Sequence, residues 1–119
     1  MTRQELQVRT KKFNVDIIVI CNALPKTIAG FEIGKQLIRS SSSVGANYRA
    51  SYRAKSRADF INKIQTIIEE SDECRYWLEI IHETKMNASA ELKRLLQEAD
   101  ELTAIFTATN KTAKNNSYR

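Results

Sequence analysis

Apolar side chains recur at alternating steps of four and three residues along most of this chain, and this spacing limits its fold more than any other feature. The clearest run, between residues 60 and 81, is Phe60, Ile64, Ile67, Ser71, Cys74, Leu78 and Ile81. Such a repeat places its members on one face of an α-helix, whereas a half-buried strand would need a period of two. Similar runs occupy residues 2–24, 31–52 and 89–109. The sequence therefore predicts an all-α protein with four long amphipathic helices.

The breaks between these runs are short and well marked. Pro25 follows the first run, and proline disfavours a helix in the residue before it. Ser56, three residues before Asp59, has the spacing of a helix N-cap at the start of the third run. Four helices with short connections predict an antiparallel up-down-up-down four-helix bundle in residues 1–109. Residues 110–119 are polar and lack an apolar face, so we expect a frayed tail there.

The second run, expected to begin near Phe31 or Glu32, contains an unusual stretch of small residues. Ser40–Ser43 is followed by Gly45 and Ala46. One interpretation is a loop that divides two short helices, because serine and glycine are poor helix formers. The other is a close crossing of two helices, in which small side chains let the backbones approach. The apolar spacing continues through the stretch and favours the close crossing.

Charge is segregated along the sequence. The chain has 19 Lys and Arg and 14 Asp and Glu, for a net charge of +5, yet residues 33–58 contain no carboxylate. Arg49, Arg53 and Arg57 are four residues apart and would share one helical face as far as the helix runs. Arginine with interleaved tyrosine can contact phosphates and stack on unpaired bases. The candidates for binding RNA or DNA are Lys35, Arg49, Tyr52, Arg53, Lys55 and Arg57.

A second interpretation of this charge pattern remains open. Residues 59–83 are rich in Asp and Glu, so an acidic third helix beside a basic second helix could simply form complementary, solvated faces. In that case the protein would be a scaffold that binds another protein, and its affinity for nucleic acid would be incidental.

The sequence disfavours an enzyme. His82 is the only histidine, and no second ligand lies at helical spacing from it, so we expect no metal site and no cofactor. Glu70 and Glu73 are three residues apart and could act as an acid–base pair, but the structural alternative is a polar cluster in which Asn47 or an arginine binds them.

Trp77 and Phe60 are the large aromatic anchors of the third helix. They would lie either in the core or at a subunit interface, where aromatic residues concentrate. The first helix is apolar on more than one side, which favours an oligomer. Cys21 and Cys74 lie on apolar faces and resemble reduced packing residues of a cytoplasmic protein. The longest early apolar run, residues 15–24, is too short to cross a membrane.

Three segments of the sequence resemble one bacterial family. They are Ser43-Val44-Gly45-Ala46-Asn47-Tyr48-Arg49, Ser56-x-x-Asp59-Phe60-Ile61-x-Lys63 and Glu70-x-x-Glu73-x-x-Tyr76-Trp77-Leu78. The chain is similar over roughly residues 5–110 to the 23S rRNA-intervening-sequence, or S23-type, proteins, some of which are encoded inside insertions in ribosomal RNA genes. The resemblance implies a cytoplasmic four-helix bundle that assembles as a ring-shaped homopentamer. A related group, the accessory variability proteins of diversity-generating retroelements, implies binding of nucleic acid and of a reverse transcriptase.

The resemblance also implies roles for particular residues. The family's motif positions fall on Arg39, Asn47, Phe60, Glu70, Glu73 and Trp77. We expect Asn47, Glu70 and Glu73 to form a polar cluster between the second and third helices, with Arg39 joining it. Relatives often carry an acidic residue where this chain has Ala50, and its absence makes the second helix more cationic.

Overall fold

The structure, a computed structural model, describes residues 1–116 and consists of four helices. They are α1 (Arg3–Asn22), α2 (Ile28–Ser51), α3 (Arg57–Glu83) and α4 (Ala90–Asn116). The part of the chain described contains no strand. The all-α prediction is confirmed.

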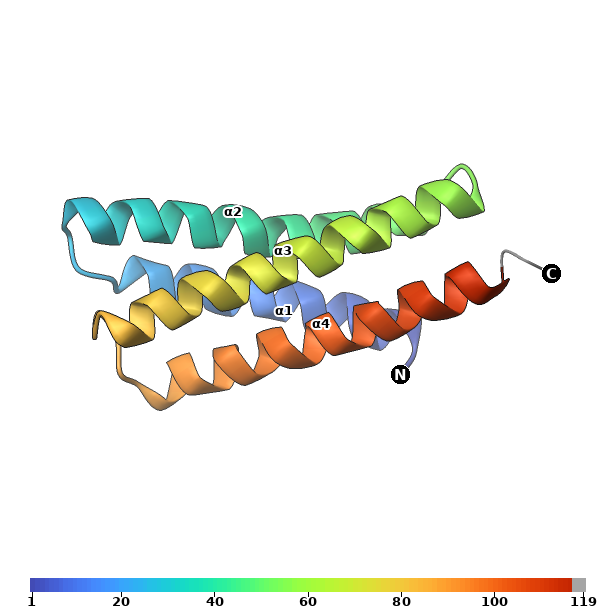
Figure 1. The fold of residues 1–119 in the computed structure, drawn as a ribbon. Helices are drawn as coiled ribbons and strands as arrows, with labels where there is room; N and C mark the ends of the chain where they lie inside the picture. Colours follow the sequence, from blue (N-terminus) through green and yellow to red (C-terminus); the bar gives the residue numbers. More distant parts are fainter. Residues whose placement is uncertain (117–119) are drawn as a thin grey trace.

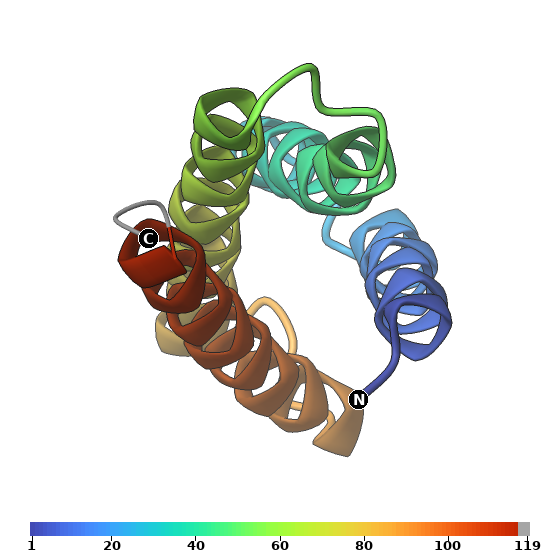
Figure 2. The same ribbon diagram turned by 90° about the vertical axis from the view of Figure 1, so that its right-hand side faces the viewer.

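The helices alternate in direction and form one elongated bundle of 52 × 22 × 22 Å (Figure 1). Each helix packs on its neighbour in the chain, and α1 also contacts α4, so the four surround a shared core. Figure 2 shows this arrangement along the bundle, from the end that carries the α2–α3 connection. The up-down-up-down order therefore agrees with the sequence prediction.

Side-chain caps set the starts of the helices. The Thr2 hydroxyl accepts a hydrogen bond from the Glu5 backbone N–H (3.1 Å), and Ser56 accepts one from the Asp59 N–H (3.0 Å). Each bond satisfies a donor that the first turn of a helix leaves without a backbone partner. Thr27 caps α2 in the same way, so α2 begins at Ile28, three residues before the expected start.

Gly30 allows the tight turn between α1 and α2. A Cβ atom at this position would lie 2.0 Å from the Pro25 carbonyl oxygen, closer than any side chain tolerates. The chain can therefore enter α2 directly after Pro25 only because residue 30 has no side chain.

The serine stretch does not interrupt α2. Ser41 and Ser42 donate hydrogen bonds to the Asn14 Oδ1 atom of α1 (3.0 and 3.1 Å), while Ser40 accepts one from the Cys74 thiol of α3 (3.3 Å). An ideal Cβ at Gly45 would lie 3.7 Å from the Thr10 carbonyl oxygen, so α1 and α2 approach closely there. The continuous helix with a close crossing is confirmed, and the divided helix is wrong.

The core is built from the residues that carry the predicted spacing. Its largest fully buried members are Phe13, Phe106, Ile17, Leu37, Ile64, Ile67, Leu78, Ile81, Leu92, Leu95, Leu102 and Val44. Both cysteines are free thiols, with Cys74 buried and Cys21 partly buried. Within the described helices, none is long and apolar enough to cross a membrane.

The polar tail begins later than the sequence predicts. Helix α4 continues to Asn116, because the first turns of α3 extend beside it and give its last turns a partner. Asn110 is buried there, and its amide donates a hydrogen bond to the Gln65 Oε1 atom of α3 (3.0 Å). Residues 110–116 are thus helical rather than frayed, and residues 117–119 of the predicted tail lie outside the described residues.

Candidate nucleic-acid interface

Cationic side chains gather at one end of the bundle, which we call the basic end. Helix α1 begins, α2 passes into α3, and α4 finishes at this end, on the right of Figure 1. Its cations come from all four helices and one loop: Arg3, Arg49, Arg53, Lys55, Arg57, Lys111 and Lys114. The fold therefore concentrates positive charge that is distributed along the sequence.

Two carboxylates lie at the same end as these cations, Glu5 in the first turn of α1 and Asp59 in the first turn of α3. Asp59 is held by the Lys55 backbone N–H (3.0 Å) and the Lys63 ammonium (3.1 Å), and these two hydrogen bonds lower the pKa of its carboxyl group. The side chains of Arg49, Arg53, Lys55 and Arg57 are exposed, and no ion pair found in residues 1–116 uses them. These cations are available to an anionic partner.

The three arginines at steps of four do not share one helical face. Arg49 lies in the last turn of α2, Arg53 lies in the connection, and Arg57 is the first residue of α3. Helix α2 ends at Ser51, and Ser56 caps the start of α3 five residues later. The candidates therefore form a surface at the end of the bundle rather than a stripe along α2.

Lys35 is not part of this surface. It lies fourteen residues before Arg49 on α2, a separation of roughly 21 Å at 1.5 Å per residue. It is exposed at the other half of the bundle, beside a recess lined by Cys21, Phe31 and Ile38. Lys35 was predicted to belong with the other cations because all of them lie between residues 33 and 58, a segment without carboxylates.

Tyr52 is already engaged with Arg3. The Arg3 guanidinium carbon lies 3.7 Å from the centre of the Tyr52 ring, and the Tyr52 hydroxyl donates a hydrogen bond to the Arg3 carbonyl oxygen (2.9 Å). Tyr48 packs against the same ring edge-to-face at 5.1 Å. A base would stack on the covered face only after Arg3 moved, so in this arrangement Tyr52 positions Arg3 at the basic end.

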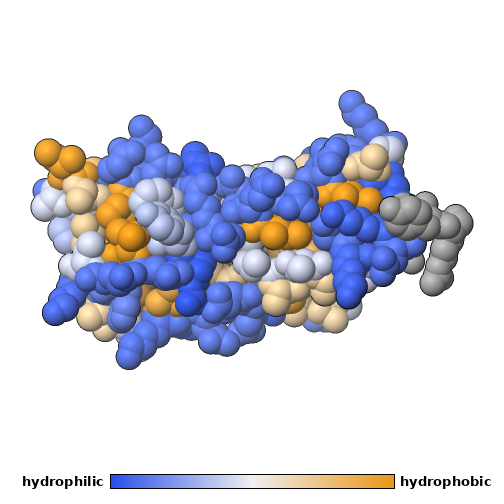
Figure 3. All heavy atoms as spheres, in the orientation of Figure 1, coloured by the Kyte–Doolittle hydropathy of each residue, from blue (hydrophilic) through white to orange (hydrophobic). Residues whose placement is uncertain are grey.

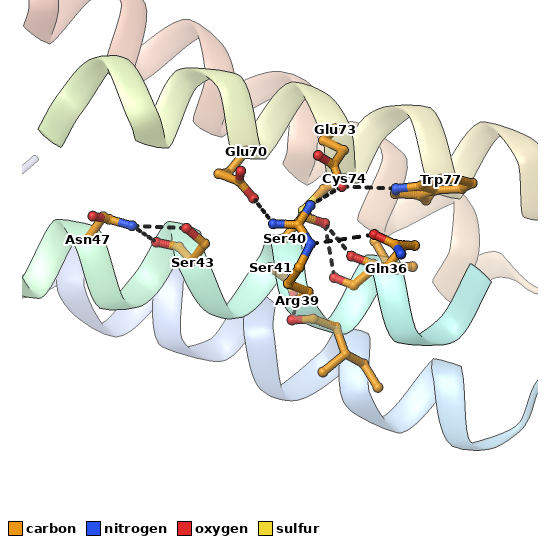
Figure 4. Close-up of polar contacts among 12 residues, drawn as sticks. Gln36, Arg39, Ser40, Ser41, Ser43, Asn47, Glu70, Glu73, Cys74 and Trp77 are labelled. Atoms are coloured by element: carbon orange, nitrogen blue, oxygen red, sulfur yellow. Dashed lines mark hydrogen bonds and ion pairs between the residues drawn. The ribbon is translucent and has the colours of Figure 1, made fainter. Parts of the chain in front are cut away.

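The predicted polar cluster forms with three of its four members. Arg39 of α2 binds Glu70 of α3 (3.1 Å) and Glu73, and the Trp77 indole N–H donates to Glu73 (3.1 Å). Figure 4 shows this group between the two helices. The hydrogen bond to Glu73 raises the pKa of Arg39 above its ordinary value. The cluster fastens α2 to α3.

Asn47 lies outside that cluster. Its amide donates to the carbonyl oxygen and the hydroxyl of Ser43 on its own helix (both 2.9 Å), as Figure 4 shows. Asn47 lies about two turns beyond Arg39 along α2, and its amide bonds to Ser43 rather than to Glu70 or Glu73. The predicted contact of Asn47 with Glu70 and Glu73 is therefore wrong.

Phe60 and Trp77 are both half-buried at the edge of the core. Trp77 meets Tyr76 edge-to-face at 5.0 Å, and Phe60 lines a shallow recess against the last turns of α4, beside Thr109 and Ala113. His82 is exposed in the last turn of α3. In residues 1–116, no three His, Cys, Asp or Glu side chains are grouped as metal ligands.

Ion pairs between α1 and α4 form a feature that the sequence reasoning missed. Arg9 binds Glu98 (2.6 Å) and Glu101 (2.8 Å), and Arg94 binds Asp16 (2.6 Å). These partners are 78 or more residues apart in the sequence. Helical spacing predicts neighbours on one helix but not across two helices.

These features define a class of protein: an antiparallel four-helix bundle with a cationic end. The model of the 23S rRNA-intervening sequence protein family matches residues 4–108, and the chain belongs to this family. A solved structure, that of a protein of unknown function from the S23 ribosomal protein family of Bacteroides thetaiotaomicron, is 30% identical. It aligns with a TM-score of 0.84 over 93% of this chain and 99% of the other. No curated protein matches the chain significantly.

Proposed function

We propose that this protein is a cytoplasmic, non-enzymatic homopentamer that binds RNA or DNA through its basic end. The observation that carries the proposal is the convergence of seven cations, from four helices and the α2–α3 connection, on one end. Among them, Arg49, Arg53, Lys55 and Arg57 are exposed and outside every described ion pair. Cations that meet phosphates release counterions from the nucleic acid, which provides affinity without sequence specificity. Membership of the S23-type family is consistent with an RNA-linked role.

The surface of the opposite end supports self-assembly. Figure 3 shows hydrophobic surface at the end of the bundle where α1 connects to α2. Large apolar side chains are also exposed on α1, behind the face drawn in Figure 3, and at the start of α2: Val15, Ile18, Val19, Ile28 and Phe31, with Ile28 90% exposed. Exposed apolar patches are typical of protein interfaces. In a closed ring, each copy would add its basic end, so the assembly would present several times the charge of one chain.

A non-enzymatic role is supported by the state of Glu70 and Glu73. Both carboxylates bind the single guanidinium of Arg39, and Glu73 also accepts from Trp77. An acid–base pair needs carboxylates that are free to exchange protons with a substrate. Here the two groups serve to join α2 to α3.

Salt-dependent binding tests the proposal. The pure protein is titrated into labelled RNA and DNA at several salt concentrations, as wild type and as Arg53→Gln/Arg57→Gln. The logarithm of the binding constant falls linearly with the logarithm of the salt concentration, and we call the steepness of this line the salt slope. The double variant should lower the salt slope by about one unit for each phosphate that it no longer neutralises. Lys26→Gln/Lys93→Gln removes the same charge away from the basic end and should leave binding unchanged. A wild-type protein that retains neither RNA nor DNA at low salt would contradict the proposal. Light scattering on the same samples gives the number of copies.

The alternative function is a scaffold or accessory subunit for another protein, such as a reverse transcriptase. The exposed apolar side chains of α1 and α2 favour it, because they would fit a different protein as well as a second copy. This alternative predicts that Arg49→Glu/Arg53→Glu preserves capture of the protein partner while nucleic-acid binding is abolished. Loss of both activities together would count against it.

A further inference from the structure

A groove between α1 and α2 extends from the basic end toward the middle of the bundle. Its volume is about 580 Å³, and Gln7, Lys11, Asn14, Ser42 and Arg49 contribute polar groups to its walls. A second recess, lined by Arg3, Gln4, Gln7 and Tyr52, adjoins it and shares Gln7. Both recesses lie beside the first half of α1.

The charged side chains that line the two recesses suit an anion. No carboxylate lines either recess. Lys11 on one wall and Arg49 on the other are exposed, and no ion pair within residues 1–116 involves them. The Asn14 Oδ1 atom is occupied by the Ser41 and Ser42 hydroxyls, which leaves the Asn14 amide group as a hydrogen-bond donor.

Small residues keep the groove open. Gly45 and Ala46 lie on its α2 side, and an ideal Cβ at Gly45 would already be in van der Waals contact with the Thr10 backbone. Larger side chains at either position would fill the space between the helices. The serine- and glycine-rich part of α2 therefore creates the hollow as well as the close crossing.

We infer that this groove holds a single strand of nucleic acid, with its phosphates between Lys11 and Arg49. The inference rests on the proposed function and adds the class of nucleic acid. A single strand exposes backbone and bases together, and proteins bind it in cationic grooves that carry aromatic and amide side chains. A duplex keeps its bases paired inside a wide cylinder and cannot enter a space between two adjacent helices. It would touch only the basic end.

A steric block tests the inference. Ala46 is exposed and helical, so Ala46→Leu should fold normally while it fills the groove without changing charge. Ala104→Leu, at an exposed site on α4, is the matched control. We expect Ala46→Leu to weaken binding of a labelled oligouridine about tenfold and to leave binding of a blunt RNA duplex unchanged. Lys11→Gln should lower the single-strand salt slope by about 0.7, the value for one phosphate that is no longer neutralised.

The outcomes separate this inference from the proposed function. If Arg53→Gln/Arg57→Gln weakens binding but Ala46→Leu and Lys11→Gln do not, the groove is overturned and the basic end stands. If Ala46→Leu changes the molar mass in light scattering and leaves oligouridine affinity intact, the inference is overturned and the groove is an interface between copies. If wild type binds neither probe, both proposals fail.

Discussion

The Arg9 guanidinium of α1 donates two parallel hydrogen bonds to the carboxylate of Glu98 of α4, from Nε to Oε2 (2.7 Å) and from Nη2 to Oε1 (2.6 Å). The side chains are only 24% and 17% exposed, so solvent screens the pair incompletely. Burial opposes the charge of Arg9, but the hydrogen bond to Glu98 outweighs it and raises the pKa of Arg9. This pair fastens α1 to α4.

Arg9→Gln should therefore destabilise the bundle. We expect the free energy of unfolding to fall by about 1–2 kcal/mol, because the variant cannot form the bidentate, charge-assisted pair and Glu98 keeps a partly buried charge. Urea denaturation of Arg9→Gln, Glu98→Gln and the double variant measures the coupling. Simple addition of the two single effects would show that the pair contributes nothing. Lys12→Gln, whose pair with Asp16 is more exposed, is the control and should change stability much less.

Low pH should reduce the free energy of unfolding, because Asp16 of α1 loses its charge and its ion pair with Arg94 of α4. Burial raises the pKa of Asp16, but hydrogen bonds from Lys12 and Arg94 outweigh it, and the pKa lies below the ordinary value of 3.8. The ionised carboxylate thus adds stability above that value, and the contribution disappears as the pH falls through the lower folded-state pKa.

Unfolding free energies measured from neutral pH to below 3.8 check this. Asp16→Asn should be less stable than wild type at neutral pH, and the difference should shrink as the acid limit is approached. A difference that stays constant with pH would contradict an ionic role for Asp16.

The two cysteines should differ in reactivity. Burial raises the pKa of the Cys21 thiol to about 11 and that of Cys74 to about 12. Thiolate is the reactive form, so both should label slowly at neutral pH. Cys74 is fully buried and should react only after unfolding, whereas Cys21 is partly exposed and should react first. Mass spectrometry after timed alkylation distinguishes the sites, with urea-unfolded protein as the control. Rapid labelling of Cys74 in the native protein would refute its buried position between α2 and α3.

Two glycines of α2 provide a matched pair. Gly30→Ala should cost about 2 kcal/mol or more, because the added Cβ would collide with the Pro25 carbonyl at 2.0 Å. Gly34→Ala meets its nearest neighbour, the Leu24 Cδ1 atom, at 3.6 Å, an ordinary contact. It should stabilise the helix by about 0.5–1 kcal/mol. Thermal and urea unfolding of both variants give the comparison. Equal effects would show that the Pro25 turn relaxes around a side chain.

The helices and their core could be predicted because one repeat encodes both. Leu37, Ser41, Val44 and Tyr48 have the spacing of a buried face, and all four are buried in the structure. The same spacing indicated that the serine stretch stays helical. The capping role of Thr27 could not be predicted in this way, because it is recognisable only once the position of the turn is known.

The candidate site was harder to predict because it depends on which helix ends meet. Arg53 and Arg57 are close in the sequence. Arg3, Lys111 and Lys114 join them only because the alternating direction of the helices brings the start of α1 and the end of α4 to the end of the bundle that holds the α2–α3 connection. The expected contact of Asn47 with Glu70 and Glu73 came from the family's motif positions, which do not say how far apart the residues lie. In the structure, Asn47 is about two helical turns from Arg39 and bonds to Ser43 instead. The groove between α1 and α2 could not be predicted from its small residues alone, because its shape depends on side chains from both helices.

The shared position of the α1 start and the α4 finish has a practical consequence for handling the protein. An affinity tag, a fluorescent fusion or a surface linker attached before α1 or after α4 would stand directly against the cations of the basic end. Such an attachment would compete with RNA or DNA for access to these cations. Immobilisation through the α3–α4 connection, at the exposed Lys85, leaves that approach clear.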